Sequence, residues 1–413
     1  MNTTPNPTYP PPVRLGPLMG RYFGLQLVVN MANGGAATYL LPLWLQELDA
    51  DSKVAHYGIV GTLAATCAII AQPLWGGLSD RTRGRWGRRA PWIAAGAGGI
   101  GCCIALLGAS SIFPLIVAAA CGVQICYSMF SAPLTAIVAD RTPVERRGVM
   151  SALGGAGAYL GVLGGVLVVS MFASRVQLGF LACAAFVVVA GVPLGIGLKR
   201  DSRLLPREPK RPVREALQSF WVSPRRYPDF AWVFVARLVL ITGFWGIYSF
   251  LLYLAQDYCG LSVEEAARVY PLLSAVLMAA ILVSIVPGGW ISDRLGRRKI
   301  VVMVASGLIG ASVIVPLLSP TIPALALSLA IAGVGFGAYL SVDQALMTQV
   351  LPSVADSGKQ LGILNIAQAG GQVLAPGVAA GVIGLVGYRG LYVFAGVMAL
   401  AAIALVAPIK SVR

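Results

Sequence analysis

The chain has 413 residues, of which 57% are hydrophobic and only 11% are charged, and its formal net charge is +15. A water-soluble domain cannot bury this much apolar surface, whereas the hydrocarbon core of a bilayer covers it. Apolar runs of about twenty residues, the length of a transmembrane helix, recur along nearly the whole sequence. We therefore predict an all-α protein embedded in a lipid bilayer.

The apolar runs predict twelve membrane spans. In chain order they cover residues 18–46, 54–79, 91–109, 112–139, 149–172, 176–197, 229–256, 265–291, 300–318, 322–349, 359–385 and 388–408. Residues 1–17 are polar and rich in proline, and they lack the pattern of a signal peptide, so they are predicted to form a tail. Residues 198–228 are rich in Lys, Arg and Pro, which predicts a basic linker between six-span units at 18–197 and 229–409, before a second tail at 410–413.

The charged residues are distributed unevenly between the two faces of the predicted membrane domain. With both termini on one side, the basic residues on the other side are Lys53, Arg175, Arg268 and Arg389. That side also carries the carboxylates of Glu47, Asp49, Asp51, Asp257, Glu264 and Glu265. An excess of Lys and Arg marks the cytoplasmic face, so both termini are predicted to be cytoplasmic. The basic charge is thus a topology signal, and we expect no nucleic acid partner.

Enzyme chemistry is not expected from the residues that usually carry it. Six of the seven cysteines lie within predicted spans, where a thiol packs as a small apolar group, and Cys259 lies in an outer loop as a free thiol. Their spacing fits neither a zinc site nor a disulfide framework. His56, the only histidine, is predicted to be a solvated loop residue. No nucleophile–base pair or phosphate-binding loop is found, so we expect no cofactor and no metal.

One motif occurs twice, each time at the end of one apolar run and before the next. The first copy runs from Gly76 through Asp80 to Arg89, and the second runs from Gly288 through Asp293 to Arg298. Four anchors match in register: Arg21 with Arg237 at an offset of 216 residues, Asp80 with Asp293 at 213, and both Arg89 with Arg298 and Pro143 with Pro352 at 209. This register predicts an internal duplication, which is how many secondary transporters are built.

Two corresponding spans carry glycines at every fourth residue. These are Gly157, Gly161 and Gly165 in the fifth span and Gly377 and Gly381 in the eleventh. Such a stripe lets two helix backbones approach closely. We expect tight static packing at these faces, and also a smooth surface along which two bundles can rock.

The doubled motif, the twelve spans and the basic linker resemble the major facilitator superfamily over essentially the whole chain. The stretch from Leu78 to Trp92 (LSDRTRGRWGRRAPW) is similar to the extended loop of the sucrose–proton and glycoside–pentoside–hexuronide symporters, as is the stretch from Ala139 to Gly148 (ADRTPVERRG). The resemblance implies two pseudo-symmetric six-helix bundles that work by alternating access, with a small-molecule substrate held between them. We expect a monomer in the plasma membrane, the bacterial inner membrane.

The resemblance also implies a gate at the cytoplasmic side. Asp80 and Asp293 would cap helix ends or pair with nearby arginines, and each contact would contribute about 1 kcal/mol. The alternative is that these loops only anchor the topology, although a carboxylate among five arginines serves no topological purpose. The residues assigned to this gate are Asp80, Arg81, Arg88, Arg89, Asp140, Arg147, Asp293, Arg294 and Arg297.

Polar residues within the spans fall on single helical faces. Span 1 carries Gln26, Asn30 and Asn33, span 4 carries Gln124, Tyr127 and Ser131, and span 11 carries Asn365, Gln368 and Gln372. An unpaired amide is costly in lipid, so these faces must meet other helices or a wet cavity. Amides in a cavity would suit the hydroxyl groups of a sugar, and aromatic rings would cover its apolar face. Candidate rings are those of Trp245, Tyr248 and Tyr339.

Asp343 is the carboxylate placed deepest within a predicted span. It lies about 10 Å from the cytoplasmic end of span 10 at helical rise. Arg237 lies at a similar depth in span 7, so the two are expected to meet across the C-terminal bundle. Ionisable groups inside a membrane are expensive and mark function, and separation of the pair would let Asp343 take up a proton. The alternative is a permanent structural ion pair.

These observations predict a secondary active transporter, coupled to protons, for a sugar or a glycoside-like polar solute. In the sugar branches, coupling carboxylates tend to lie on spans 2 or 4, and these spans have none in their interiors here, which disfavours a sodium site. The first alternative is a proton-driven exporter of an amphipathic drug, natural product or lipid, which would need a cavity lined mostly by Met, Phe and Leu. The second is a sensor or scaffold, for which the linker and tails are too short to hold a signalling domain.

Overall fold

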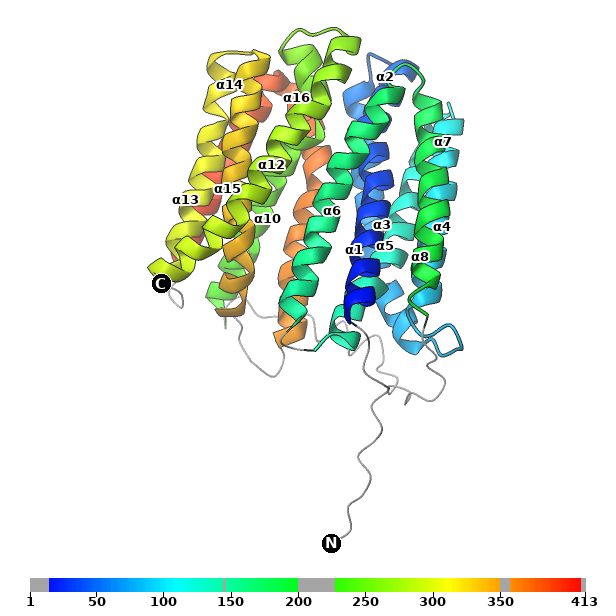
Figure 1. Ribbon diagram of the computed structural model, residues 1–413. Helices are drawn as coiled ribbons and strands as arrows, with labels where there is room; N and C mark the ends of the chain where they lie inside the picture. Colours follow the sequence, from blue (N-terminus) through cyan, green and yellow to red (C-terminus); the bar gives the residue numbers. More distant parts are fainter. Residues whose placement is uncertain (1–14, 144–145, 200–226, 350–356, 410–413) are drawn as a thin grey trace.

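The computed structural model describes residues 15–143, 146–199, 227–349 and 357–409 (Figure 1). Within these residues the chain forms helices and no strands. The predicted tails, apart from residues 15–17, and residues 200–226 of the predicted linker lie outside the described residues. The prediction of an all-α membrane protein is confirmed.

The first half of the chain comprises six helical segments, some of which contain a π-helical or 3-10 turn. They are α1 (Leu15–Gly35) with η1 (Ala36–Leu40) and α2 (Leu41–Leu48); α3 (Lys53–Arg81); α4 (Ala90–Ala109); α5 (Phe113–Arg141); α6 (Arg147–Val169) with η3 (Ser170–Phe172); and α7 (Val176–Phe186) with η4 (Val187–Gly191) and α8 (Val192–Ile196). The bounds of α3, α4 and α5 agree with the predicted spans to within two or three residues.

The second half repeats this order. Its segments are α10 (Pro228–Ser249) with α11 (Leu251–Tyr253) and η5 (Leu254–Tyr258); α12 (Val263–Leu295); α13 (Arg298–Ser312) with α14 (Ile314–Leu318); α15 (Ile322–Gln349); and α16 (Ser357–Val406). α16 contains two spans, because Gly387 interrupts it with φ +73°, a backbone conformation that favours glycine. Among the described residues, ten helices are long and apolar enough to cross a membrane. The α1–η1–α2 segment and the division of α16 bring the spans to twelve.

The two halves pack their helices in the same way, as expected for a duplicated unit. In the first half α1 packs on α6, α3 on α5, and α4 on α5 and α7. In the second half the equivalent pairs are α10 with α16, α12 with α15, and α13 with α15 and α16. The halves meet through α3 with α16 and α6 with α12, which are again equivalent pairs. The predicted pseudo-symmetric arrangement of two bundles is therefore confirmed.

The two glycine stripes lie in different kinds of contact. Gly157 and Gly161 face α1 within the first half, where an added Cβ would lie 2.9 Å from the Phe23 carbonyl oxygen and 2.6 Å from that of Leu27. Gly377 on α16 instead faces Thr62 on α3, across the boundary between the halves. The stripe on α6 thus allows close packing inside one bundle, whereas Gly377 on α16 allows close packing between the two halves.

The two ends of the helical bundle differ in charge, and we name them accordingly. The basic end carries the α3–α4 and α12–α13 connections, with their arginines, and the start of α1. The acidic end carries the α1–α3 segment with Asp49 and Asp51 and the α10–α12 segment with Asp257. In Figure 1 the basic end is at the bottom.

Candidate functional site

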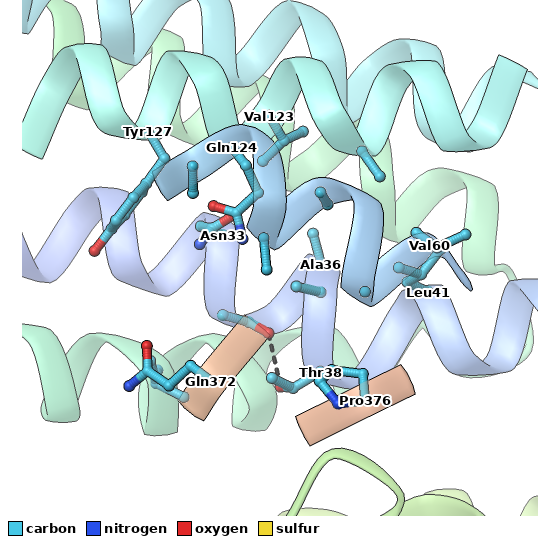
Figure 2. Close-up of a pocket in the computed structure, with 18 of the residues that line it drawn as sticks. Asn33, Ala36, Thr38, Leu41, Val60, Val123, Gln124, Tyr127, Gln372 and Pro376 are labelled. Atoms are coloured by element: carbon cyan, nitrogen blue, oxygen red, sulfur yellow. Dashed lines mark hydrogen bonds between the residues drawn. The ribbon is translucent and has the colours of Figure 1, made fainter. Parts of the chain in front are cut away.

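A cavity of about 490 Å³ lies between the two halves, within the size range of small-molecule binding sites. The first half contributes residues of α1, η1, α2, α3, α4, α5 and α6, and the second half contributes residues of α10, α12 and α16. Figure 2 shows Asn33, Gln124 and Gln372 among the side chains around this space. η1 gives the wall its shape, because a π-helical turn displaces the backbone at Ala36 and Thr38.

The described residues that line the cavity are all uncharged. Four side-chain amides face it, from Asn33, Gln72, Gln124 and Gln372. Ser131 donates a hydrogen bond to Oε1 of Gln72 at 3.1 Å, which leaves the amide NH2 of Gln72 available as a donor. Most of the remaining lining residues are apolar, with alanine the most frequent among them. The cavity therefore offers neutral donors and acceptors on an apolar background.

Aromatic side chains of α10 form one wall of the cavity. The rings of Trp245 and Tyr248 meet edge to face, with centroids 5.3 Å apart. The indole Nε1–H of Trp245 is buried and has no hydrogen-bond partner among the described residues. A buried donor without a partner is costly, so this N–H is suited to an acceptor on a bound solute.

Contacts between the halves close the cavity toward the acidic end. Lys53 on α3 forms an ion pair of 2.8 Å with Asp257 on η5, and its side chain is only 11% exposed. The hydroxyl of Tyr39 donates to the carbonyl oxygen of Ala267 at 2.9 Å. The hydroxyl of Tyr253 likewise donates across the boundary, to the carbonyl oxygen of a proline in α2, at 2.9 Å. These contacts join residues more than two hundred positions apart, and we refer to them as the acidic-end lock.

The predicted polar face of α1 is divided between the cavity and a helix contact. Asn33 lines the cavity, as do Gln124 and Tyr127 of α5. The Tyr127 hydroxyl donates to Oδ1 of Asn30 at 3.0 Å, and the Asn30 amide donates to Oε1 of Gln26 at 3.1 Å. Gln26 and Asn30 do not line the cavity. Asn30 instead fixes the position of the Tyr127 side chain, which does line it.

Arg237 and Asp343 lie together, buried inside the second half. An N–O distance of 3.2 Å joins them, and their side chains are 1% and 3% exposed. Arg237 also donates to Oε1 of Gln368 on α16, and the Tyr339 hydroxyl points toward the Asp343 carboxylate. None of these four residues lines the central cavity, and Arg237, Tyr339 and Asp343 line a separate void of about 10 Å³. The side chain of Asn365 is outside the described residues.

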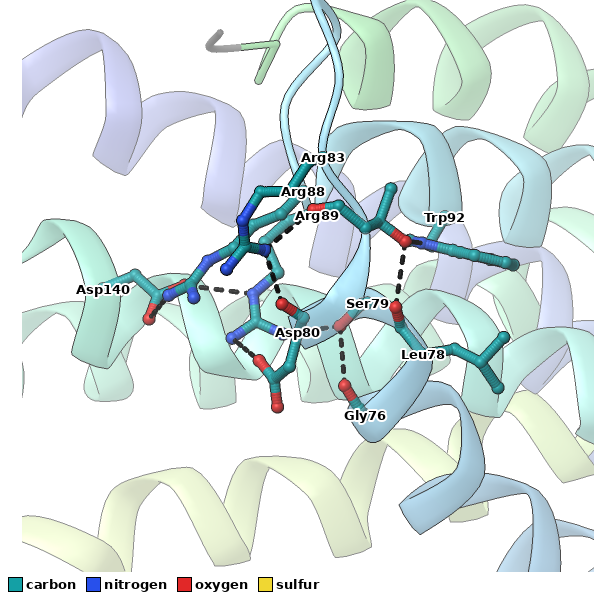
Figure 3. A network of polar contacts seen from close by, with 10 residues as sticks. Gly76, Leu78, Ser79, Asp80, Arg83, Arg88, Arg89, Trp92 and Asp140 are labelled. Atoms are coloured by element: carbon teal, nitrogen blue, oxygen red, sulfur yellow. Dashed lines mark hydrogen bonds and ion pairs between the residues drawn. The ribbon is translucent and has the colours of Figure 1, made fainter. Parts of the chain in front are cut away.

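At the basic end, the first copy of the repeated motif forms a network of ion pairs (Figure 3). Arg89 contacts Asp80 at 2.6 Å, Asp140 at 3.0 Å and the Ser79 hydroxyl at 2.5 Å. Arg88 contacts the other oxygen of Asp140 at 2.5 Å. These contacts fasten α3 and the α3–α4 loop to α5 within the first half.

The other residues assigned to the gate lie apart from this network. Arg81 is exposed, and Arg147 donates to the carbonyl oxygen of Thr142 at 3.2 Å. Arg294 lies over the Trp290 ring at 5.1 Å, and Arg297 is exposed before α13. The side chain of Asp293 is outside the described residues.

Sequence reasoning missed two features of the site. Gln72 lies within a predicted span and has the same signal as the amides of α1 and α5, but it has no polar neighbour three or four positions away, and Ser79, seven positions on, lies at the end of the span. Lys53 lies at the edge of a span, where a lysine normally reaches water. Only the fold shows that Asp257, from the other half, lies beside it.

Comparisons with known proteins give one family and one fold. The family model described as Major Facilitator Superfamily matches residues 23–283 and 266–412. The multidrug resistance protein MdtG of Escherichia fergusonii is 26% identical over 317 residues, which cover 74% of each chain, and that of Salmonella arizonae is equally similar. Among solved structures, a variant of the nucleoside transporter NupG matches with a TM-score of 0.74, at 16% identity, over 94% of this chain and 99% of that one. The peptide transporter POT in complex with sulfate matches with a TM-score of 0.72, at 16% identity, over 95% and 93%.

Proposed function

This chain belongs to the major facilitator superfamily, and on that basis we propose that it carries a neutral, hydroxyl-bearing solute of the sugar or glycoside class through the central cavity. It is a multi-pass membrane transporter and not an enzyme. The observation that carries the proposal is the cavity lining, with four amides and no charged side chain among the described residues. An ionic substrate would need a counter-charge there, whereas amides bind hydroxyl groups as donors and acceptors alike.

Trp245 is proposed to bind the solute directly. Its unpartnered indole N–H meets the need for a donor to a hydroxyl oxygen, and its ring covers an apolar sugar face. Gln124 and Asn33, from the first half, face the same space. The solute would then contact both halves, which is how occupancy biases their relative position.

The conformation supports an assignment of the two sides of the membrane. We propose that the basic end is cytoplasmic, because Lys and Arg mark that face, and that the protein is a monomer in a bacterial inner membrane. With the acidic-end lock formed, the cavity would then be closed to the outside, as in the inward-facing state of an alternating-access cycle. The Asp80–Arg89–Asp140 network would be one part of the gate that closes the cytoplasmic side in the other state.

Arg237 and Asp343 are proposed to couple transport to protons. Arg237 contacts Gln368, and Gln372, one helical turn further along α16, lines the cavity. Movement of α16 with the solute would therefore draw Gln368 and Arg237 away from Asp343. A buried carboxylate that loses its cation takes up a proton, because the charged form is then costly. Gln368 would thus position Arg237 rather than bind the solute.

The test uses the purified protein in proteoliposomes with sucrose and methyl β-D-glucoside as probes. We expect one of them to raise the unfolding temperature and to support counterflow exchange. Trp245→Phe, which keeps an aromatic ring and removes the donor, should weaken binding by about 3- to 10-fold, the value of one hydrogen bond. Trp232→Phe on the exposed face of the same helix is the matched control. Failure of every neutral polyol to bind would refute the substrate class.

Proton coupling is tested separately with Asp343→Asn. This variant should lose accumulation driven by a proton gradient and keep counterflow, which needs no net proton movement. Accumulation at the level of the unchanged protein would reject the role of Asp343, even if the substrate class proves right.

The similarity to MdtG favours a second candidate, export of an amphipathic compound. The abundance of aliphatic side chains in the cavity is compatible with such a solute, although Met278 is its only methionine among the described lining residues and phenylalanine is absent from them. Stabilisation by the dye rhodamine 6G, together with no response to either sugar, would favour export over the polar solute.

A further inference from the structure

Two cysteines on neighbouring helices of the first half lie together in matching surroundings. On α4, Gly99 and Cys103 are four residues apart, and on α5, Gly122 and Cys126 have the same spacing. A Cβ added to Gly99 would lie 2.6 Å from the Cys126 sulfur, and one added to Gly122 would lie 2.8 Å from the Cys103 sulfur. Each thiol therefore occupies the space that a glycine of the opposite helix leaves open.

Helix geometry directs the two thiols toward each other. α4 and α5 are antiparallel neighbours, so Gly99 lies level with Cys126, and Cys103 lies level with Gly122. Side chains of a helix tilt toward its N-terminus, which sends each thiol toward the level of the other. Cys103 and Cys126 therefore face each other between α4 and α5.

We propose that Cys103 and Cys126 form a two-coordinate binding site for a soft divalent cation of the Hg²⁺ type. The ion would bind between the two sulfurs: two S–H bonds break, two S–Hg bonds form and two protons leave. The product is electrically neutral, which matters because an uncompensated charge inside a bilayer is expensive. Thiolate is also the ligand that soft ions prefer.

Other occupants fit these residues less well. Structural zinc takes four ligands, and the described residues contain no group of three or more His, Cys, Asp and Glu side chains that could hold a metal. A monovalent ion such as Cu⁺ would leave the two thiolates with a net negative charge in lipid. Charge balance and the number of ligands thus both select a divalent ion that accepts two-fold coordination.

The test uses the full-length chain with only the two relevant cysteines retained. The cysteines replaced by serine are Cys67, Cys102, Cys121, Cys183 and Cys259, so that no other free thiol competes for the ion. Titration with HgCl₂, followed by intact-protein mass spectrometry and maleimide labelling, should give one Hg per chain and no free thiol. Two Hg per chain, or one Hg with one thiol still reactive, would mean that the thiols act independently and would overturn the proposal.

A second set of variants keeps the test decisive if the serine background does not fold. In the otherwise unchanged chain, Gly122→Ala should displace the Cys103 thiol and lower Hg²⁺ affinity at least tenfold, although both cysteines remain. Gly98→Ala is the matched control, because its Cβ would meet only Val192 at an ordinary 3.7 Å. Equal affinities in the two glycine variants would also overturn the proposal. Neither result depends on which solute the protein carries.

Discussion

The two copies of one helix contribute differently to the two halves of the molecule. α5 lines the cavity with Gln124 and Tyr127, and its Leu134 is fully buried in the core. At the 209-residue offset of the duplicated anchors, α15 carries Asp343 where α5 carries Leu134. No described residue of α15 lines the cavity. One copy thus faces the proposed solute, and the other holds a buried charge.

The two arginines that match in the duplication, Arg21 and Arg237, also differ in their surroundings. Arg21 on α1 is exposed and donates to the carbonyl oxygen of Gly197 at 2.5 Å. Its counterpart Arg237 is buried and paired with Asp343. The described arginine–aspartate pairs of the first half lie at the basic end, whereas the Arg237–Asp343 pair of the second half lies inside its bundle. We propose that the two copies of this helix took on separate tasks after the duplication, solute contact on α5 and charge chemistry on α15.

The sharpest way to break this comparison is to remove the buried carboxylate. Asp343→Ala leaves the Arg237 guanidinium buried, and Arg cannot lose its proton, so we expect a loss of about 3–5 kcal/mol of stability. Thermal unfolding of the purified protein, followed by tryptophan fluorescence, measures it. The double variant Arg237→Leu/Asp343→Ala should recover most of the loss. A single variant as stable as the unchanged protein would show that the pair is not buried in the way described.

The basic-end network should respond less strongly, because water reaches it. Arg89→Ala removes contacts to Asp80, Asp140 and Ser79, but Asp80 is 38% exposed and solvent can replace its partner. We expect a loss of about 2 kcal/mol, in the range of a hydrogen bond to a charged group. The same unfolding measurement applies, and Arg81→Ala, an exposed neighbour, is the control. Equal losses for Arg89→Ala and Asp343→Ala would remove the distinction between the halves.

The sequence was sufficient for the fold because membrane spans depend on local composition. Each span needs only a run of apolar residues, and the repeated motif around Asp80 and Asp293 shows where the duplication falls. The positions of Arg237 and Asp343 within their spans were likewise enough to predict that they meet, because depth in the membrane is fixed by helical rise.

The direction in which each polar face points could not be predicted in the same way. Asn30 and Asn33 share a face of α1, yet Asn33 reaches the cavity and Asn30 binds Tyr127. A cavity and a hydrogen bond to a neighbouring helix both provide partners for an amide. The spacing of residues in the sequence therefore cannot show which of the two occurs. The same holds for Lys53, whose partner Asp257 is distant in sequence and lies in the other half. Contacts between halves depend on conformation, which the residue pattern does not contain.

The acidic-end lock provides a smaller perturbation, because it acts on the balance between conformations. Lys53→Met removes the ion pair with Asp257 and should shift the equilibrium toward opening at that end by about 1 kcal/mol, roughly fivefold. Spin labels placed on the two sides of the acidic end, measured by double electron–electron resonance, report the open fraction. An unchanged distance distribution would mean that the aromatic and backbone contacts alone hold the lock.

The smallest effect is expected at an ion pair that belongs to neither task. Glu264 and Arg268 lie one turn apart on α12, 3.9 Å from each other, with side chains 86% and 80% exposed. Water screens both charges, so Glu264→Gln should change neither the unfolding temperature nor the open fraction measurably. If Glu264→Gln changed the open fraction as much as Lys53→Met does, the total charge at the acidic end, and not a specific contact, would control opening. Of these two ion pairs, Lys53–Asp257 joins the two halves and Glu264–Arg268 does not, so we expect the specific contact to decide.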